Sequence, residues 1–451
     1  MDYEYLKCIT PIDGRYKSKT KNLEQYFSEM SFNKYRLYIE IEYLISLGEL
    51  KLFHMNEDMS HFLRNIHNKF SFDECIKMKK IEEEINHDVK AVEYYMRNYI
   101  TENYTTQNNS KGILNFIHFG LTSQDINSSA NILMIKDSIS KEIHPLFSDI
   151  SNIIEDIGSK WSHIPMLAKT HGQPASPTFM GKEFFVFNER LQKQFNILKN
   201  VSYTTKFGGA TGNLNAHYTS LPTIDWINFS DTFVKKLGLI RNKYTTQIDH
   251  YDNYSEIFDC IKRINVILID LCQDIWLYIS RNILIQKVNK KEVGSSTMPH
   301  KINPINFENA EGNFLLANSL LEFFSRKLPI SRMQRDLTDS TILRNVGSAF
   351  SYTMIALNSL KQGLNKLEIN NYALNRELTD NFIVVTEGIQ TRMKVIGVEN
   401  SYEKMKEITR KNSDSKTELI KFIDESNFTE SEKTYLKSIT PFNYTGVFKV
   451  K

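Results

Sequence analysis

One eleven-residue segment concentrates groups that could do chemistry: Gly294 to Pro304 reads GSSTMPHKINP. It follows residues 239–293, which contain neither glycine nor proline and therefore favour helix. A simple connector needs only a few turn residues, but this segment also carries hydroxyls, a histidine and a lysine. Its first residues, Gly294 with Ser295 and Ser296, predict a loop that offers free backbone N–H groups.

The end of the same segment predicts a region of positive potential. Asn303 followed by Pro304 has the order of a helix N-cap and a first helical residue, and an apolar pattern resumes at Ile305. Lys301 and a helix N-terminus would both favour a bound carboxylate. They would also favour an ionised serine hydroxyl, because nearby positive charge stabilises the anion. The alternative is a structural linker, which would need neither the lysine nor the prolines.

A second candidate for chemistry is His171, in the segment THGQPA at residues 170–175. We expect this histidine at the entrance of a helix, just before a glycine. A histidine in such a place can change its charge near neutral pH and act as a general acid or base. The alternative is a capping or surface histidine.

Two arginines and several hydroxyls lie together between Arg335 and Arg344, in the sequence RDLTDSTILR. We expect a helix to begin near Thr341. Arginines with hydroxyl donors at a helix start form a set of groups that binds phosphate. The alternative is an ordinary cap with arginine–aspartate pairs on the surface.

Three further polar segments lie near predicted helix ends. Residues 86–90 read NHDVK and residues 122–125 read TSQD, and helix caps are the alternative for both. Residues 208–213, GGATGN, are rich in glycine. No strand is predicted before them, so we do not expect a dinucleotide site or a P-loop there.

The sequence carries no signature of a metal or a cofactor. The patterns HExxH and GxSxG and a paired Cys/His set are absent, and the 11 histidines are scattered. We therefore expect no metal and no cofactor. Acid–base catalysis combined with anion binding is the economical class of chemistry.

The bulk composition excludes several classes of partner. The 451 residues are 41% hydrophobic with a net charge of +3, so the composition indicates neither a nucleic-acid surface nor a membrane surface. No run of about 18 apolar residues predicts a membrane span. The N-terminal sequence MDYEYLKCIT has no apolar signal core, and the four cysteines form no CxxC pair. A reducing cytoplasm is therefore the expected location.

The elements that must position these groups are predicted to be helices. Residues 255–286 place apolar side chains three to four positions apart over many turns, which predicts one long helix. It is apolar on more than one face, so we expect it at the centre of a bundle or in a subunit interface. Similar patterns occupy residues 124–160, 178–202, 305–327 and 341–365.

Alternating runs typical of strands are scarce, so we predict an all-α fold with a long central helical bundle. The central bundle is expected at residues 112–364. A small N-terminal helical domain is expected at residues 1–111, and a small C-terminal helical domain at residues 365–451.

Seven segments together resemble the adenylosuccinate lyase family of the fumarase/aspartase superfamily, in the type found in many proteobacteria. They are TPIDGRY (10–16), NHDVKAVEY (86–94), FGLTSQDIN (119–127), THGQPASP (170–177), YTTQI (244–248), MPHKINPINFEN (298–309) and SRMQRDLTDSTILRN (331–345). The resemblance runs in order over nearly the whole chain, from about residue 8 to about residue 445. It implies a three-domain all-α fumarase/aspartase-like fold. It also implies a homotetramer whose active sites each combine residues of three subunits.

The resemblance implies elimination of fumarate from two substrates of purine nucleotide biosynthesis. Adenylosuccinate would give AMP, and the succinyl-carboxamide ribotide SAICAR would give AICAR. Both reactions break a C–N bond after a weakly acidic C–H next to a carboxylate loses its proton. The site must therefore stabilise negative charge and protonate the departing nitrogen.

The resemblance also assigns roles to residues of this sequence. Ser295 is implied as the general base, His171 as the general acid, and Glu308 as the residue that orients His171. The groups implied to hold the succinyl carboxylates are Lys301, Asn303, Thr122, Ser123 and Ser296. His87 and Gln247 are implied to lie near the substrate. The groups implied to hold phosphate and ribose are Arg15, Tyr16, Arg335, Ser340 and Arg344, with Asp88 and Asn309 nearby.

Two departures and three alternatives accompany this resemblance. Gln124 stands where an acidic residue is common, and residues 206–211, KFGGAT, also vary. Neither is expected to touch the proposed acid, base or phosphate-binding groups. Another lyase of the superfamily would leave the arginines of residues 335–344 unexplained, because its substrate carries no phosphate. A non-catalytic helical scaffold would predict damage at Ser295 or His171, and both are intact. On a secondary binding role the sequence is silent.

Overall fold

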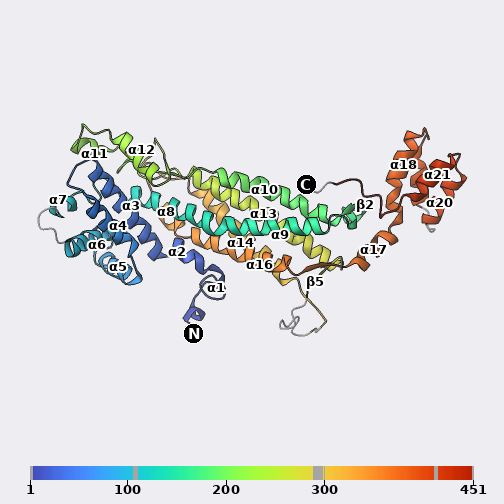
Figure 1. Cartoon of the computed structure of the whole chain (residues 1–451), viewed down its shortest axis with the longest axis horizontal. Helices are drawn as coiled ribbons and strands as arrows, with labels where there is room; N and C mark the ends of the chain where they lie inside the picture. The colour runs from blue at the N-terminus through green and yellow to red at the C-terminus, as the bar shows by residue number, and fades with distance from the viewer. Residues whose placement is uncertain (1–3, 105–109, 288–297, 299, 411–414, 449–451) are drawn as a thin grey trace. The chain divides into compact units, whose positions relative to one another are not determined.

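The computed structural model describes residues 4–104, 110–287, 298, 300–410 and 415–448, and helices dominate it (Figure 1). The predicted all-α class is confirmed. The chain divides into two compact units. The first comprises residues 1–147, 194–266 and 312–358, and the second comprises residues 148–193, 267–311 and 359–451. The division into three domains at residues 111 and 364 stays a prediction.

The N-terminal helices belong to the first unit. They are η1 (Glu4–Lys7), α1 (Lys17–Thr20), η2 (Lys21–Leu23), α2 (Glu24–Phe27), α3 (Glu29–Glu49), α4 (Glu57–Asn68), α5 (Phe72–Ile85), α6 (Asp88–Asn103) and α7 (Ser110–Leu114). Polar side chains fix where several of them begin. Ser28, Asn56 and Ser71 each accept a hydrogen bond from the backbone N–H three residues later, at the starts of α3, α4 and α5.

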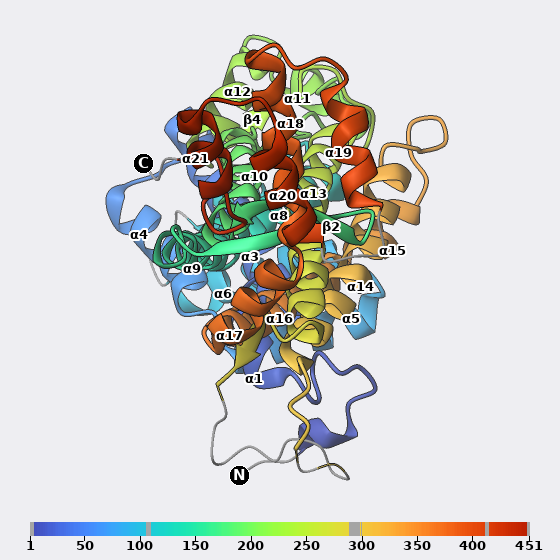
Figure 2. The same cartoon turned by 90° about the vertical axis from the view of Figure 1, so that its right-hand side faces the viewer.

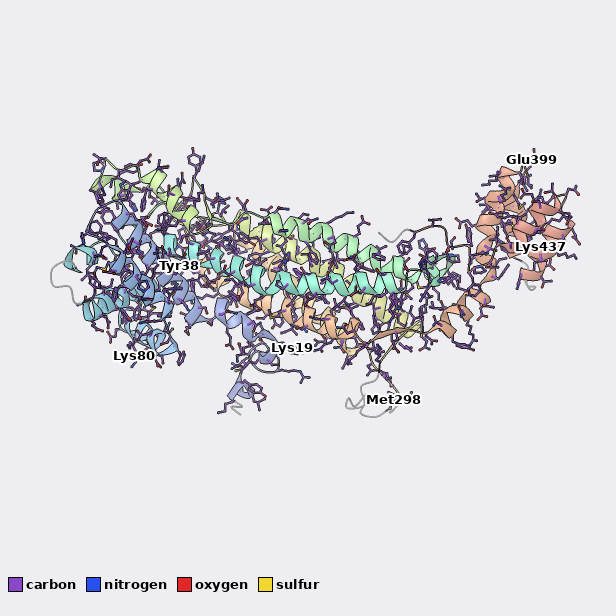
Figure 3. The ribbon with its side chains drawn as sticks, viewed as in Figure 1. Lys19, Tyr38, Lys80, Met298, Glu399 and Lys437 are labelled. Atoms are coloured by element: carbon purple, nitrogen blue, oxygen red, sulfur yellow. The ribbon has the colours of Figure 1, made fainter. Side chains whose placement is uncertain are left out.

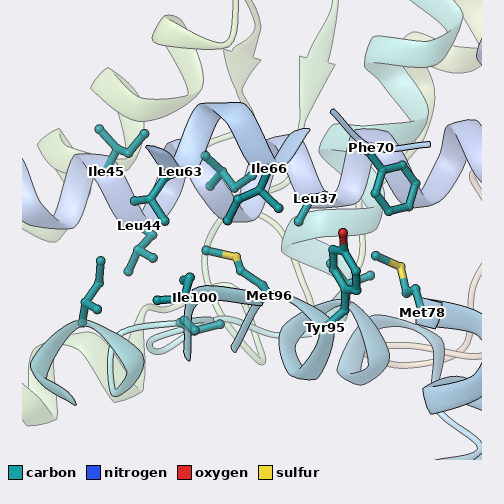
Figure 4. Packing of buried hydrophobic residues seen from close by; sticks show 14 of the residues in the cluster. Leu37, Leu44, Ile45, Leu63, Ile66, Phe70, Met78, Tyr95, Met96 and Ile100 are labelled. Atoms are coloured by element: carbon teal, nitrogen blue, oxygen red, sulfur yellow. The ribbon is translucent and has the colours of Figure 1, made fainter. Parts of the chain in front are cut away.

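These helices enclose an apolar core (Figure 4). Its fully buried members include Leu37 and Leu44 of α3, Leu63 and Ile66 of α4, and Met96 and Ile100 of α6. Burying a leucine or isoleucine side chain contributes about 1.5–3 kcal/mol, so this core is the main source of stability for the N-terminal helices. It holds the ends of α3, α5 and α6, where the candidate polar groups lie.

The predicted helical ranges contain helices, but residues 341–365 are divided between two helices that are separated at Arg344 and Asn345. The helices are α8 (Ser123–Ser138), the π-helical turn η3 (Ile139–Ile143), α9 (His144–Lys160), α10 (Met180–Asn200), α13 (Asp252–Ser280), α14 (Ile305–Lys327), α15 (Thr338–Leu343) and α16 (Val346–Leu364). Two shorter ones are α11 (Asn215–Ser220) and α12 (Trp226–Lys236). The helix expected over residues 255–286 ends earlier, because Asn282 takes a φ of 57° and Leu284–Gln286 form a strand.

Helix α13 is apolar on more than one face, as the sequence predicts. Its buried side chains include Ile257, Phe258, Ile261, Ile264, Ile267, Leu268, Leu271 and Ile275. Val266, Trp276 and Leu277 are apolar but 42–51% exposed. Within the described chain, no helix is both long enough and apolar enough to cross a membrane.

Three two-stranded sheets lie within the described ranges of the chain. The strands β1 (Pro165–Thr170) and β2 (Gln173–Phe179) form an antiparallel hairpin. The strands β3 (Thr204–Thr205) and β4 (Ile240–Arg241) are parallel. The strands β5 (Leu284–Gln286) and β6 (Leu367–Ile369) are antiparallel.

The C-terminal helices, which are labelled in Figure 2, belong to the second unit. They are α17 (Asn371–Asp380), η4 (Phe382–Val385), α18 (Thr386–Val395), α19 (Ser401–Thr409), α20 (Ser415–Glu425) and α21 (Glu430–Ser438). They share a separate apolar cluster with members such as Ile389, Met393, Leu419 and Leu436. Helix α17 packs against β1 and η4 packs against β2, so these elements support the hairpin.

Candidate active site

A pocket of about 140 Å³ in the first unit brings together three of the residues singled out by the sequence. Asp88 begins α6, Ser340 lies in α15, and Arg344 directly follows α15. The Arg344 guanidinium lies 3.3 Å from the Asp88 carboxylate and 3.1 Å from Glu29. Segments more than 250 positions apart therefore meet in one polar site, and its hydroxyl, carboxylates and guanidinium can hold a sugar or a phosphate group.

A buried arginine that the sequence analysis missed organises this pocket. Arg36 of α3 is 1% exposed and lies 2.5 Å from the Asp88 carboxylate. It also donates to Asn127 at 2.8 Å and to Asn33 at 3.0 Å. Burial alone would raise the pKa of Asp88, but Arg36, the Val89 N–H and Arg344 outweigh it and hold that pKa below its usual range. The sequence signal that could have identified Arg36 is its position as the single arginine in the apolar pattern of residues 29–49.

His87 caps the helix that Asp88 begins. Its Nδ1 accepts a hydrogen bond of 3.1 Å from the Lys90 backbone N–H, so the neutral ring carries its proton on Nε2. The side chain is 53% exposed. The cap and the proposed place near the substrate are therefore compatible, because one ring nitrogen holds the helix and the other remains a donor.

Arg335 and Gln247 also lie together, although 88 positions separate them in the sequence. The Arg335 guanidinium donates to the Gln247 side-chain oxygen at 3.2 Å, and both residues are half-buried. Arg15 and Tyr16 precede α1 and are not among the residues that line the pocket. Their role at the substrate stays a prediction.

Thr122 and Ser123 lie at the start of α8, where Asp125 fixes the backbone. Its Oδ2 accepts from the Thr122 N–H at 2.8 Å, and its Oδ1 accepts from the Lys206 ammonium at 2.6 Å. Asp125 and Lys206 have fully buried side chains. The carboxylate thus holds the turn that carries the two proposed carboxylate-binding hydroxyls.

The glycine-rich segment, residues 208–213, binds the same Asp125 carboxylate through its backbone. The backbone N–H groups of Gly208 and Gly209 donate to Asp125 at 2.8 and 3.1 Å. The expectation that no strand precedes this segment is wrong, because β3 ends at Thr205. The strand has only two residues, and the amides that would cradle a phosphate already bind a buried side chain. A dinucleotide or P-loop site is still not indicated.

His118, just before this turn, is a second charged group that the sequence analysis does not identify, and its side chain is 12% exposed. Its Nδ1 lies 2.5 Å from Glu40, and its Nε2 lies 3.8 Å from Glu93. Burial by itself would lower the pKa of His118, but Glu40, with smaller effects from Glu93 and Asp125, outweighs burial and raises it to about 9. The imidazolium therefore places one positive charge between the Glu40 and Glu93 carboxylates at neutral pH.

This cluster predicts a pH-dependent stability. The pKa of His118 rises from the ordinary 6.5 to about 9 on folding, so its contribution is complete below pH 6.5 and is lost as pH rises through about 9. The shift corresponds to about 3 kcal/mol at its maximum. We expect the melting temperature of wild type to fall between pH 6.5 and 9 relative to that of His118→Gln. An exposed control, His61→Gln, should follow wild type. Parallel curves for wild type and His118→Gln would contradict the charged state.

The second unit holds His171, but in a hairpin and not at a helix entrance as expected. Thr170 pairs with Gln173, so His171 and Gly172 form a two-residue loop between β1 and β2. Their φ values are 53° and 73°, which is the backbone of a type I′ turn. Such a turn places His171 in the exposed tip of the hairpin. Ser176 of β2 donates a hydrogen bond to Glu387 of α18, which holds the hairpin against that helix.

The polar groups before and within α14 also lie in the second unit. Lys301 is exposed and Asn303 is half-buried. The expected cap is shifted by one residue: the Pro304 carbonyl accepts from the Glu308 N–H at 3.3 Å, so Pro304 and not Asn303 occupies the N-cap position. Ser295 and Ser296 lie outside the described residues. Met298, labelled in Figure 3, is the described residue nearest to them in the sequence.

Glu308 has a defined partner within the second unit. The Trp276 indole N–H of α13 donates to the Glu308 carboxylate at 3.1 Å. No hydrogen bond joins Glu308 to His171 in the part of the chain that is described. Asn309 is half-buried on the same helix, one position further. The proposed pairing of Glu308 with His171 therefore stays a prediction.

The structure corrects the expectation for Gln124. This residue is 2% exposed and lines the same pocket as Asp88, Ser340 and Arg344. It therefore belongs with the candidate binding groups and not away from them. Lys206 follows the expectation, because it contacts Asp125 and the Gly209 carbonyl and does not line the pocket.

Comparisons with known proteins identify the family to which this chain belongs. A family model described as lyase matches residues 14–315, and one described as adenylosuccinate lyase C-terminal matches residues 331–445. Adenylosuccinate lyase from Dictyostelium discoideum is 49% identical over 98% of this chain and 97% of its own length. The enzyme of that name from Escherichia coli is 42% identical over 99% and 98%.

Solved structures show the same fold at low sequence identity. A fumarate lyase from Mesorhizobium aligns with a TM-score of 0.76 at 15% identity, over 94% of this chain and 95% of that one. A beta-carboxy-cis,cis-muconate cycloisomerase from Acinetobacter calcoaceticus aligns with a TM-score of 0.72 at 15% identity, over 96% and 97%. The sequence matches decide the family within this fold, and the chain belongs to the adenylosuccinate lyase family.

Proposed function

We propose that this chain is a C–N lyase of purine nucleotide biosynthesis. It eliminates fumarate from adenylosuccinate, giving AMP, and from SAICAR, giving AICAR. The observation that carries the proposal is the match to adenylosuccinate lyases over nearly the whole chain. The pocket that joins Asp88, Ser340 and Arg344 supports it, because both substrates carry a ribose phosphate.

The reaction has a defined proton balance. Ser295, as its alkoxide, takes the proton from the carbon next to a succinyl carboxylate. The electrons of that C–H bond form the double bond of fumarate as the C–N bond breaks. His171, protonated, gives its proton to the departing nitrogen. The side chains alone supply this chemistry, so the proposal requires no cofactor.

The succinyl part of the substrate must be held while charge builds on it. Lys301 and Asn303, with Ser296, supply an ammonium, an amide and a hydroxyl for one carboxylate. Thr122 and Ser123 supply hydroxyls and the start of α8, where the helix dipole favours an anion. These donors are worth most when they meet the intermediate, which carries more charge than the substrate.

The nucleotide part of the substrate is held by the residues that gather in the first unit. Arg335 with Gln247, and Arg344 with Ser340, supply guanidinium and hydroxyl donors for phosphate and ribose. Arg15 and Tyr16 add to this set, with His87 and Asp88 near the substrate. Asn309, which lies on α14 in the second unit, is also proposed to lie near the substrate. Arg344 is 46% exposed, so a phosphate can reach it from solvent.

The proposal includes a homotetramer with active sites shared between subunits. His171 has no hydrogen-bond partner among the described residues, which is expected when another subunit completes its site. The apolar residues that α13 and α14 leave 42–62% exposed suit a helical interface; they are Val266, Trp276, Leu277, Ile305, Leu315, Leu316 and Phe323. The proposed location is the cytoplasm, where the chain's cysteines stay unpaired.

An ultraviolet absorbance assay with each purified substrate tests this function. Wild type should release fumarate with AMP from adenylosuccinate, and fumarate with AICAR from SAICAR. Release of fumarate from argininosuccinate or malate instead would assign another lyase activity. A folded tetramer that turns over neither nucleotide would favour a binding or scaffold role.

Arg344→Ala should weaken the binding of the phosphate. Loss of a charge-assisted hydrogen bond predicts a KM for adenylosuccinate raised about ten- to a hundredfold, with a smaller change in kcat. Inhibition by AMP should weaken while inhibition by adenosine, which lacks the phosphate, should not. Arg332→Ala is the matched control, because that side chain is 82% exposed and does not line the pocket. An unchanged KM would remove Arg344 from the phosphate site.

A further inference from the structure

Gln124 is a buried polar side chain whose partner is missing from the described chain. It is 2% exposed and lines the 140 Å³ pocket, and no hydrogen bond joins its amide to another described residue. Its amide faces the space of the pocket, where water or a ligand can hydrogen-bond it, as buried polar side chains in native proteins require. Asn131 lines the same pocket, and within the described residues its amide is also unpaired.

The charges of the pocket indicate what kind of group it accepts. Arg36 and Arg344 are balanced by Asp88 and Glu29, and Arg36 is already bound by Asp88, Asn33 and Asn127. A phosphate inside this pocket would lie beside two carboxylates. Hydroxyl groups, in contrast, can donate to a carboxylate and accept from an amide or a guanidinium.

The size of the pocket agrees with a small polar group. A volume of about 140 Å³ has room for several water molecules or for a small polar group such as the hydroxyl-bearing side of a sugar. Arg344 is half-exposed and can bind the phosphate from solvent.

We propose that Gln124 is a specificity-determining residue that hydrogen-bonds a ribose hydroxyl of the substrate. The amide oxygen accepts from the hydroxyl or the amide N–H donates to it, while Asp88 and Asn131 complete its surroundings. This inference rests on the proposed function, because that function supplies the ribose. Gln124 would then recognise the sugar, in addition to the groups that bind the phosphate.

Double-mutant cycles with substrate analogues test this contact. Gln124→Met keeps the side-chain length but removes both polar atoms, so KM for adenylosuccinate should rise about three- to tenfold. With the 2′-deoxy or the 3′-deoxy analogue, whichever lacks the contacted hydroxyl, the same substitution should change KM less than twofold. Such non-additivity is the signature of a direct interaction. An equal rise with all three substrates would overturn the proposal.

A second variant distinguishes a hydroxyl from a phosphate. Gln124→Glu keeps an acceptor for a hydroxyl, so KM should rise less than in Gln124→Met. A phosphate at this position would be repelled, and Gln124→Glu would then be the worse variant, which would also overturn the proposal. Gln25→Met, at an exposed glutamine outside this pocket, is the control. Wild-type turnover of adenylosuccinate in the same assay shows separately whether the proposed function holds.

Discussion

Ser295→Ala should lower kcat for adenylosuccinate by roughly a hundred- to ten-thousandfold and leave KM within a few-fold of wild type. The hydroxyl is proposed to take the carbon-bound proton, and removal of a general base has an effect of this size. The other donors that hold the succinyl and nucleotide parts stay in place, so binding survives. Initial rates by ultraviolet absorbance give kcat, and substrate titration followed by tryptophan fluorescence gives the affinity.

Ser296→Ala is the matched control for this substitution, because it removes the neighbouring hydroxyl from the same segment. Ser296 is proposed to bind a carboxylate, so its loss should raise KM and retain most of kcat. The reverse pattern, with Ser296→Ala inactive and Ser295→Ala active, would transfer the role of the base to Ser296. Exchange of the carbon-bound hydrogen with solvent deuterium, if it persisted in Ser295→Ala, would show that another group removes the proton.

The helices could be predicted from the sequence because their signals are local. Apolar spacing of three to four residues extends over the whole of α13 and α14, and Pro329 follows closely on the end of α14. The hairpin that carries His171 was missed for a different reason. The apolar residues of β1 are too few to show alternation, and the sign of φ at His171 depends on the pairing of Thr170 with Gln173.

The motifs located residues of the candidate site, but their contacts could not be derived from the sequence. Arg36 and Asp88 are 52 positions apart, and nothing in either segment indicates that the two side chains meet. The sequence predicts no contact between Gln124 and the phosphate-binding groups, because a sequence does not show which side chains line the same pocket. The packing of the helices decides which distant residues meet, and the sequence of either segment alone carries no signal for such a contact.

Lys206→Met should be among the most destabilising single substitutions in the first unit. Lys206 and Asp125 are both fully buried, and their 2.6 Å ion pair also anchors Thr122, Gly208 and Gly209 through backbone N–H groups. Removal of the ammonium leaves an uncompensated buried carboxylate, which costs about 3–5 kcal/mol. The first unfolding transition in urea should shift to lower concentration by a corresponding amount. The activity that remains should show a raised KM, because the Thr122 turn loses its anchor.

Two variants separate the charge effect from a loss of packing. The double variant Lys206→Met with Asp125→Asn removes both charges, so it should recover part of the stability that Lys206→Met loses. Lys193→Met breaks the pair with Glu189, whose side chains are 68% and 70% exposed, and should cost less than about 1 kcal/mol. Equal destabilisation by Lys206→Met and by the double variant would mean that packing of the lysine stem, and not the buried ion pair, holds this turn in place.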